Sequence, residues 1–84
     1  MVLNAYSIYD VKAANYRTPF FCSTNGMATR MFSDLAADQQ SIVFKHPDDF
    51  KLYFIGTFDD YSGELDRVNV PEFLATASDF MAKA

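Results

Sequence analysis

The sequence predicts one α+β domain: a small, mainly antiparallel sheet in the order β-β-α-β-β-α, with two helices packed on one face. The length of 84 residues fits a single domain over residues 1–84. Strand and helix patterns do not alternate strictly, and the turn expected after Asp59 is tight. Both observations favour hairpin connections over a parallel sheet.

Strand patterns occur in several segments. Residues 2–11 mix β-branched and aromatic side chains, and neither alternate set is strongly polar, which predicts a central strand covered on both sides. Residues 19–23 form a short strand candidate, and residues 42–44 a short extended piece. Residues 52–58 are apolar on both faces, and Gly56 within them indicates a bulge or a close backbone contact. Asp60 and Gly63 then favour a hairpin into residues 64–68.

Two segments have helical periodicity. Residues 23–40 are the clearer one, with Ser23, Thr24 or Asn25 able to cap the first turn. Its apolar stripe is Ala28, Met31, Phe32, Leu35 and Ala36. Pro71 is expected to open a second helix that continues to the C-terminus, with a stripe of Phe73, Leu74, Ala77, Phe80 and Met81.

Composition limits the function. The net charge of −4 argues against a protein that coats nucleic acid by charge alone. A single cysteine, Cys22, excludes an intramolecular disulfide and a multi-cysteine zinc module, and we interpret it as a buried apolar residue. Half of the residues are hydrophobic and 17% are aromatic, so some rings are expected at an exposed surface or a homodimer interface. Without a signal peptide or a long apolar run, we expect a cytoplasmic protein outside the membrane.

One stretch raises the question of catalysis, because His46 lies near the pairs Asp48-Asp49 and Asp59-Asp60. An intervening strand places the two pairs roughly 30 Å apart, too far for a shared metal or a carboxylate dyad. We therefore interpret the residues as turns, and expect no catalytic, metal or cofactor-binding residues. A concave pocket lined by His46 and two or more carboxylates would reopen the question of an enzyme.

Rings interleaved with basic residues suggest a second kind of site. Single-stranded nucleic acid binds by stacking bases on aromatic rings, with cations along the backbone. The candidate contacts to nucleic acid or to a partner are Arg17, Arg30, Lys45, Lys51, Tyr53 and Phe54. The alternative is that the rings form the core and a dimer interface.

Four segments together resemble a known family: LNAYSIYDVKAANY, TPFF, GMATRMFSDL and HPDDFKLYFIGTFDDYSGEL. In this order they are similar to the small nonstructural protein of gokushoviruses, single-stranded DNA phages of the Microviridae. The resemblance extends to about Leu65 and fades beyond it. It implies a non-catalytic accessory protein of the host cytoplasm, compared by genome role with protein C of the coliphage microviruses, which acts in single-stranded DNA synthesis and packaging.

Three functions therefore stay open. The first is an accessory protein, expected as a homodimer, that binds phage replication or packaging components. The second is a module that binds single-stranded DNA directly, and the third is a factor that binds a host protein. The resemblance provides no catalytic residues to transfer to this chain.

Overall fold

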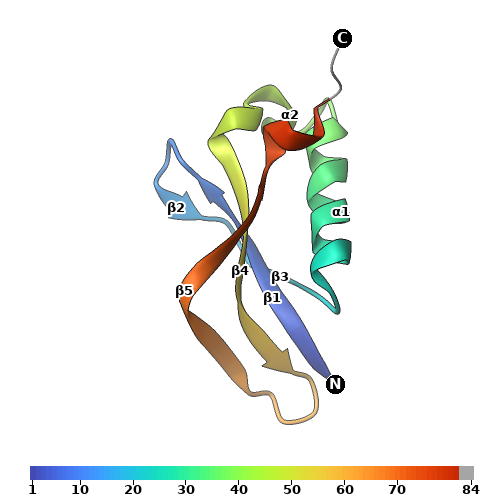
Figure 1. Ribbon diagram of the computed structural model, residues 1–84, viewed down its shortest axis with the longest axis vertical. Helices are drawn as coiled ribbons and strands as arrows, with labels where there is room; N and C mark the ends of the chain where they lie inside the picture. Colours follow the sequence, from blue (N-terminus) through green and yellow to red (C-terminus); the bar gives the residue numbers. More distant parts are fainter. Residues whose placement is uncertain (82–84) are drawn as a thin grey trace.

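The computed structural model describes residues 1–81 and confirms the α+β class with an antiparallel sheet (Figure 1). Its elements are β1 (Val2–Asp10), β2 (Asn15–Tyr16), β3 (Phe20–Cys22), α1 (Asn25–Ala37), α2 (Ile42–Lys45), β4 (Phe50–Asp59) and β5 (Leu65–Thr76), with short 3-10 turns η1 (Pro47–Asp49) and η2 (Ala77–Phe80). The strands form one sheet in the order β2-β1-β4-β5, and β3 pairs with another part of β1 than β2 does.

The core lies between the sheet and α1. Tyr6, Ile8 and Leu52 from the two central strands are buried against it. On α1, Ala28, Phe32 and Ala36 are fully buried, which confirms part of the predicted stripe. The Thr24 hydroxyl caps this helix by accepting a hydrogen bond of 3.2 Å from the amide of Met27.

The predicted stripe on α1 was too wide. Met31 and Leu35 are 47% and 39% exposed, because they lie beside the fully buried row of Ala28, Phe32 and Ala36. Met31 still touches the sheet through its Sδ atom, which is 3.3 Å from Cys22 Sγ of β3. A narrow buried row is enough to pack α1 on the sheet, because within residues 1–81 no other element covers the outer side of this helix (Figure 1).

Gly56 confirms the expected close backbone contact. A Cβ atom at this position would overlap the carbonyl oxygen of Asp66 in the neighbouring strand. The registers of β4 with both neighbours shift between Phe54 and Gly56, so Ile55 is an extra residue and the strand has a bulge. The bulge reverses the alternation of side chains along the second half of β4.

The helix predicted from Pro71 onward is wrong. The chain continues as β5 to Thr76, and only a single 3-10 turn, η2, follows. Cross-strand pairing passes from Glu72 directly to Arg67, so Pro71 lies in a stretch of β5 that has no partner residue in β4. Proline is tolerated in a strand at such a break because it has no amide hydrogen to pair. The predicted end of that helix, residues 82–84, lies outside the described residues.

The short extended piece predicted over residues 42–44 is also wrong. These residues form the single-turn helix α2, and the Ser41 hydroxyl caps it by accepting a hydrogen bond of 3.0 Å from the amide of Val43. Val43 is buried while Ile42 is exposed, so one buried side chain holds the turn against the core. The predicted turn at residues 46–49 is present as η1.

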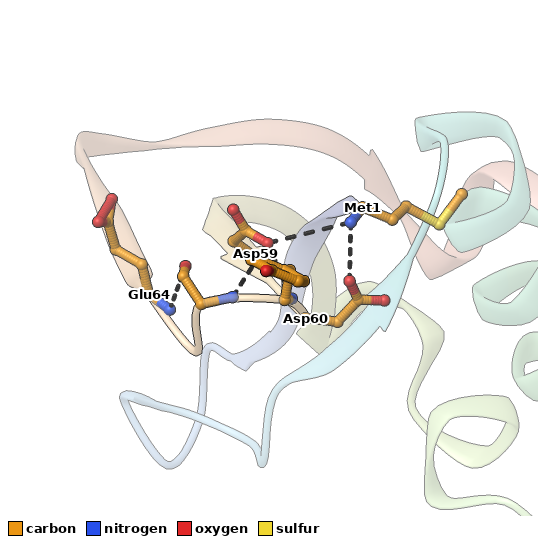
Figure 2. A network of polar contacts seen from close by, with 6 residues as sticks. Met1, Asp59, Asp60 and Glu64 are labelled. Carbon is orange, nitrogen blue, oxygen red and sulfur yellow. Dashed lines mark hydrogen bonds and ion pairs between the residues drawn. The ribbon is translucent and has the colours of Figure 1, made fainter.

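The predicted hairpin after β4 is present, with a different aspartate in the main role. Gly63 has a φ of 78°, and Asp59 accepts amide hydrogens from Tyr61 and Ser62 at 2.9 and 3.4 Å. Asp60 instead accepts a hydrogen bond of 2.8 Å from the Met1 amino group, as Figure 2 shows. The N-terminus of β1 is therefore tied to the turn that joins β4 and β5.

Candidate nucleic-acid interface

The two faces of the sheet differ in what covers them. Even-numbered residues of β1, such as Tyr6 and Ile8, point toward α1, which lies along one side of the sheet (Figure 1). Odd-numbered residues of β1 and their direct cross-strand partners share the opposite face. We call this the open face; its paired residues are Leu3, Ala5, Ser7, Tyr9, Tyr16, Phe21, Lys51, Tyr53, Gly56, Phe58, Leu65, Arg67, Phe73 and Thr76.

Four rings on the open face form a contiguous group, here called the aromatic cluster: Tyr9, Tyr16, Tyr53 and Phe73. The Tyr9 and Tyr16 centroids are 4.8 Å apart, and Tyr53 lies 6.2 and 5.8 Å from them. Phe73 lies 5.8 Å from Tyr53 on the other side. All four distances fall in the range of favourable aromatic pairs, so the rings support one another across β2, β1, β4 and β5.

The aromatic cluster is partly exposed. Tyr16 is 45% and Phe73 52% exposed, whereas Tyr9 and Tyr53 between them are half-buried. Burial raises the pKa of Tyr16, and the neighbouring Tyr53 and Tyr9 hydroxyls act in the same direction. The Tyr16 phenol therefore stays neutral at physiological pH and adds no negative charge to this surface.

A cation lies beside the rings. Lys51 Nζ is 5.8 Å from the centroid of Phe73 and donates a hydrogen bond of 3.2 Å to Thr76 Oγ1. This position satisfies the distance for a cation–π interaction, which holds the ammonium close to the ring while leaving it able to meet an anion. Lysine and rings thus share one surface.

Charge is segregated between the faces. Among the paired residues of the open face in residues 1–81, Lys51 and Arg67 are basic and none is acidic. The acidic residues within the strands pair on the side that faces α1; they are Asp10, Asp59, Asp66 and Glu72. The overall charge of −4 is therefore a poor guide to the open face, because the acids of the strands pair on the opposite side. Asp66 nevertheless also lines a depression that it shares with Ala5 and Arg67 of the open face.

The structure separates the candidate residues named from the sequence. Lys51 and Tyr53 lie together on the open face. Phe54 points to the other side, where its ring is 5.8 Å from that of Tyr6 and packs against the core. Adjacent strand residues point to opposite faces, so Tyr53 and Phe54 cannot serve one surface.

The other three candidates are scattered. Arg30 is exposed on α1, and Lys45 is exposed at the end of α2. Arg17 follows β2 and lines a cavity of about 700 Å³, with Leu35 and Met31 of α1 among its other walls. None of these three lies among the paired residues of the open face.

Sequence reasoning missed Tyr9, Tyr16, Phe73 and Arg67 as members of the same surface. The alternation of residues 2–11 puts Tyr9 on one strand face with Leu3 and Ala5, and this is the signal that the sequence offers for Tyr9. The position of Phe73 was hidden by its assignment to a helix, because helical spacing disguised its pairing with Tyr53.

Two surface depressions meet the criterion set for reconsidering an enzyme. One of about 370 Å³ is lined by His46, Asp10 and Asp49, and one of about 230 Å³ by His46, Asp48 and Asp49. The Asp10 carboxylate, however, accepts the amides of Lys12 and Ala13 and so caps a turn. His46 is exposed and makes no side-chain hydrogen bond to these carboxylates, so no oriented acid–base pair forms.

Other chemistry has little support in the described part of the chain. No group of three or more His, Cys, Asp and Glu residues within residues 1–81 has the arrangement of a metal site. Cys22 is buried, as expected, and burial raises the pKa of its thiol, which disfavours the nucleophilic thiolate. None of the helices described is long and apolar enough to cross a membrane.

Comparison with known proteins gives one match. No curated protein and no solved structure has significant similarity to this chain. A family model described as "Phage ORF5 protein" matches residues 3–80, which includes every strand and helix described above except for Val2, the first residue of β1. The match reaches beyond Leu65, where the resemblance noted from the sequence faded, and through β5. The chain belongs to the Phage ORF5 protein family.

Proposed function

We propose that this phage protein is a non-catalytic accessory factor in single-stranded DNA synthesis or packaging, and that it binds single-stranded DNA directly on the open face. Membership of a phage family supports a role in infection. The resemblance to the gokushovirus nonstructural protein favours a phage whose genome is single-stranded DNA. The binding mode follows from the sheet.

The observation that carries the proposal is the aromatic cluster beside Lys51 on a sheet face that α1 leaves uncovered. Every base has a π-face, so a row of rings binds a single strand with little dependence on sequence. Duplex DNA hides these faces within its stack. The arrangement therefore favours single-stranded over double-stranded nucleic acid.

Charge makes a small contribution in this proposal. Two cations on the open face, Lys51 and Arg67, neutralise about two phosphates. For single strands this gives a slope of about −1.4 in a plot of log affinity against log salt concentration. Binding is expected to be modest in affinity and to persist at moderate salt, because stacking supplies most of the free energy.

Fluorescence anisotropy with a labelled oligodeoxythymidine, at low and at high salt, tests the proposal. We expect saturable binding at low salt, a shallow salt slope, and weaker binding to a duplex of equal length. Absence of binding at low salt contradicts direct DNA binding, because a charge-assisted complex is strongest there.

A protein partner is the competing occupant of the open face. Exposed rings are also typical of the centres of protein interfaces. Affinity capture from infected cells, with and without nuclease, separates the two: DNA-dependent capture supports the proposal, and nuclease-resistant capture of a phage or host protein through the same rings contradicts it.

A further inference from the structure

A hollow lies on the open face next to the aromatic cluster. Its volume is about 270 Å³, and Ala5 and Gly56 form its floor. Pro19, Phe21, Ile55 and Leu65 are its apolar walls, and Asp66 and Arg67 are its polar residues. The floor is low because a directly paired alanine and glycine have almost no side chain. Only glycine fits at position 56, because a Cβ atom there would overlap the Asp66 carbonyl oxygen.

The hollow continues the row of paired residues that begins at the aromatic cluster. Along β1 the successive open-face pairs are Tyr9 with Lys51, Ser7 with Tyr53, and Ala5 with Gly56. Two residues along a strand span about 7 Å. The sugar–phosphate repeat of an unstacked strand covers a distance of this order, so a base following one stacked on Tyr53 reaches the hollow.

The chemistry of the walls suits a nucleobase. Phe21 is 43% exposed and its ring is 5.5 Å from that of Phe58, which fixes an aromatic wall. An apolar cavity of roughly 150 Å³ can hold a benzene ring, so the hollow has room for a larger flat heterocycle. Arg67 offers a planar fork of donors for a phosphate or for the edge of a base.

We infer that this hollow is a base-binding subsite, which takes one unstacked nucleobase of the strand bound on the aromatic cluster while Arg67 contacts its phosphate or its edge. The inference rests on the proposed function and adds a specific element to it. A flat stacking surface alone treats every nucleotide alike, whereas a subsite of limited depth gives the bound strand a fixed register.

Ala5→Val tests the subsite because the added methyl groups enter the hollow and leave the aromatic cluster intact. A β-branched residue is favourable in a central strand, so valine suits the backbone at position 5. The matched control is Ala37→Val, at an exposed position of α1 outside the hollow. Anisotropy is measured with oligodeoxythymidine and with an abasic sugar–phosphate chain of equal length. We expect Ala5→Val to weaken oligodeoxythymidine binding at least about 5-fold and to leave abasic binding unchanged.

Arg67→Gln tests the cation separately. It is expected to weaken binding of both probes and to make the salt slope shallower by about 0.7, the loss of one phosphate contact. If wild-type protein binds oligodeoxythymidine and Ala5→Val binds it equally well, the subsite is contradicted while the proposed function stands. If wild-type protein binds no oligonucleotide, both fail.

A measurement on unaltered protein guards against a variant that does not fold. An oligonucleotide containing 5-iodouracil is cross-linked by light, and the modified peptide is identified by mass spectrometry. We expect cross-links at Phe21 as well as at rings of the aromatic cluster. Cross-links at the cluster without any at Phe21 contradict the subsite.

Discussion

At the scale of single residues, Tyr53 is the central ring of the aromatic cluster. Its ring contacts Tyr9, Tyr16 and Phe73, so it joins the rings of β1 and β2 to that of β5. Phe54, the next residue, packs in the core instead. Two adjacent rings therefore have separate roles, one in the proposed binding and one in stability.

Substitution of Tyr53 tests this division. Tyr53→Ala is expected to weaken single-stranded DNA binding about 5- to 150-fold, the range for loss of one base-stacking ring. Tyr61→Ala is the matched control, since Tyr61 is 94% exposed in the hairpin and far from the cluster in the sheet register. Anisotropy titrations measure both, and equal affinities for the two variants contradict the role of the cluster.

Gly56 provides a residue-scale test of the fold. Gly56→Ala is expected to lower the free energy of unfolding by about 1–3 kcal/mol, because the new methyl group overlaps the Asp66 carbonyl oxygen. Gly26→Ala in the first turn of α1 is the control: its Cβ meets nothing nearer than Thr24 Oγ1 at 3.8 Å. Urea unfolding compares them, and a neutral Gly56→Ala contradicts the close strand contact.

At the scale of elements, the sequence predicts features that depend on neighbouring residues, but it does not predict which strands pair. The Thr24 cap and the Gly63 turn depend on neighbouring residues, so the sequence predicted them. The course of the chain after Pro71 depends on pairing with β4, about twenty residues earlier, and the helical spacing of Phe73, Leu74 and Ala77 gave the wrong element.

The open face depends on a register that no local pattern reveals. The bulge at Ile55 moves Phe58 to the side of Tyr53; without it, Phe58 would face α1. Tyr9 and Tyr16 meet because the turn between them pairs them directly. Of the candidate contacts named from the sequence, Lys51 and Tyr53 share the open face because they are two residues apart in β4.

The hydrogen bond between the Met1 amino group and Asp60, in the turn between β4 and β5, predicts that the stability of the fold depends on pH. The Asp60 hydrogen bond raises the pKa of the Met1 amino group from 8.0, with Asp60 and Asp59 charges adding to it. Stabilisation from the amine is therefore complete below pH 8.0 and is lost as pH rises through the raised value. Amides of Tyr61 and Ser62 lower the pKa of Asp59 from 3.8, so its contribution is present above pH 3.8 and lost in stronger acid.

The ion pair between the Met1 amino group and Asp60 is tested by thermal unfolding midpoints of the wild type and of Asp60→Asn, measured across pH. The protein used must have a free Met1 amine. We expect the variant to be slightly less stable at neutral pH, and the two curves to converge above pH 8 as the amine loses its proton. Salt is expected to reduce the difference, because both groups are exposed. A difference that persists unchanged to high pH contradicts the ion pair.

At the scale of the whole molecule, β5 leaves a strand edge unpaired. Within residues 1–81 it pairs only with β4, and Val70 and Leu65 on it are 77% and 66% exposed. Such an edge is a site for pairing with a second chain, and a symmetric pair would join two open faces. We propose the homodimer on this ground.

Light scattering tests the homodimer. We expect the mass of a dimer at high concentration, and a shift toward monomer in Val70→Lys, which places a charge on the edge strand. Met27→Lys on α1 is the control, since Met27 is 53% exposed and distant from β5 in the fold. A monomer at every concentration contradicts this proposal and leaves DNA binding by a single open face intact.

Binding of single-stranded DNA on the open face can be observed residue by residue. The measurement is a titration of isotope-labelled protein with oligodeoxythymidine, followed by amide and aromatic NMR shifts. We predict the largest shifts at Tyr9, Tyr16, Tyr53 and Phe73, with little change at Ala28 and Phe32 on the buried side of α1. Shifts confined to α1, or none at low salt, would contradict it.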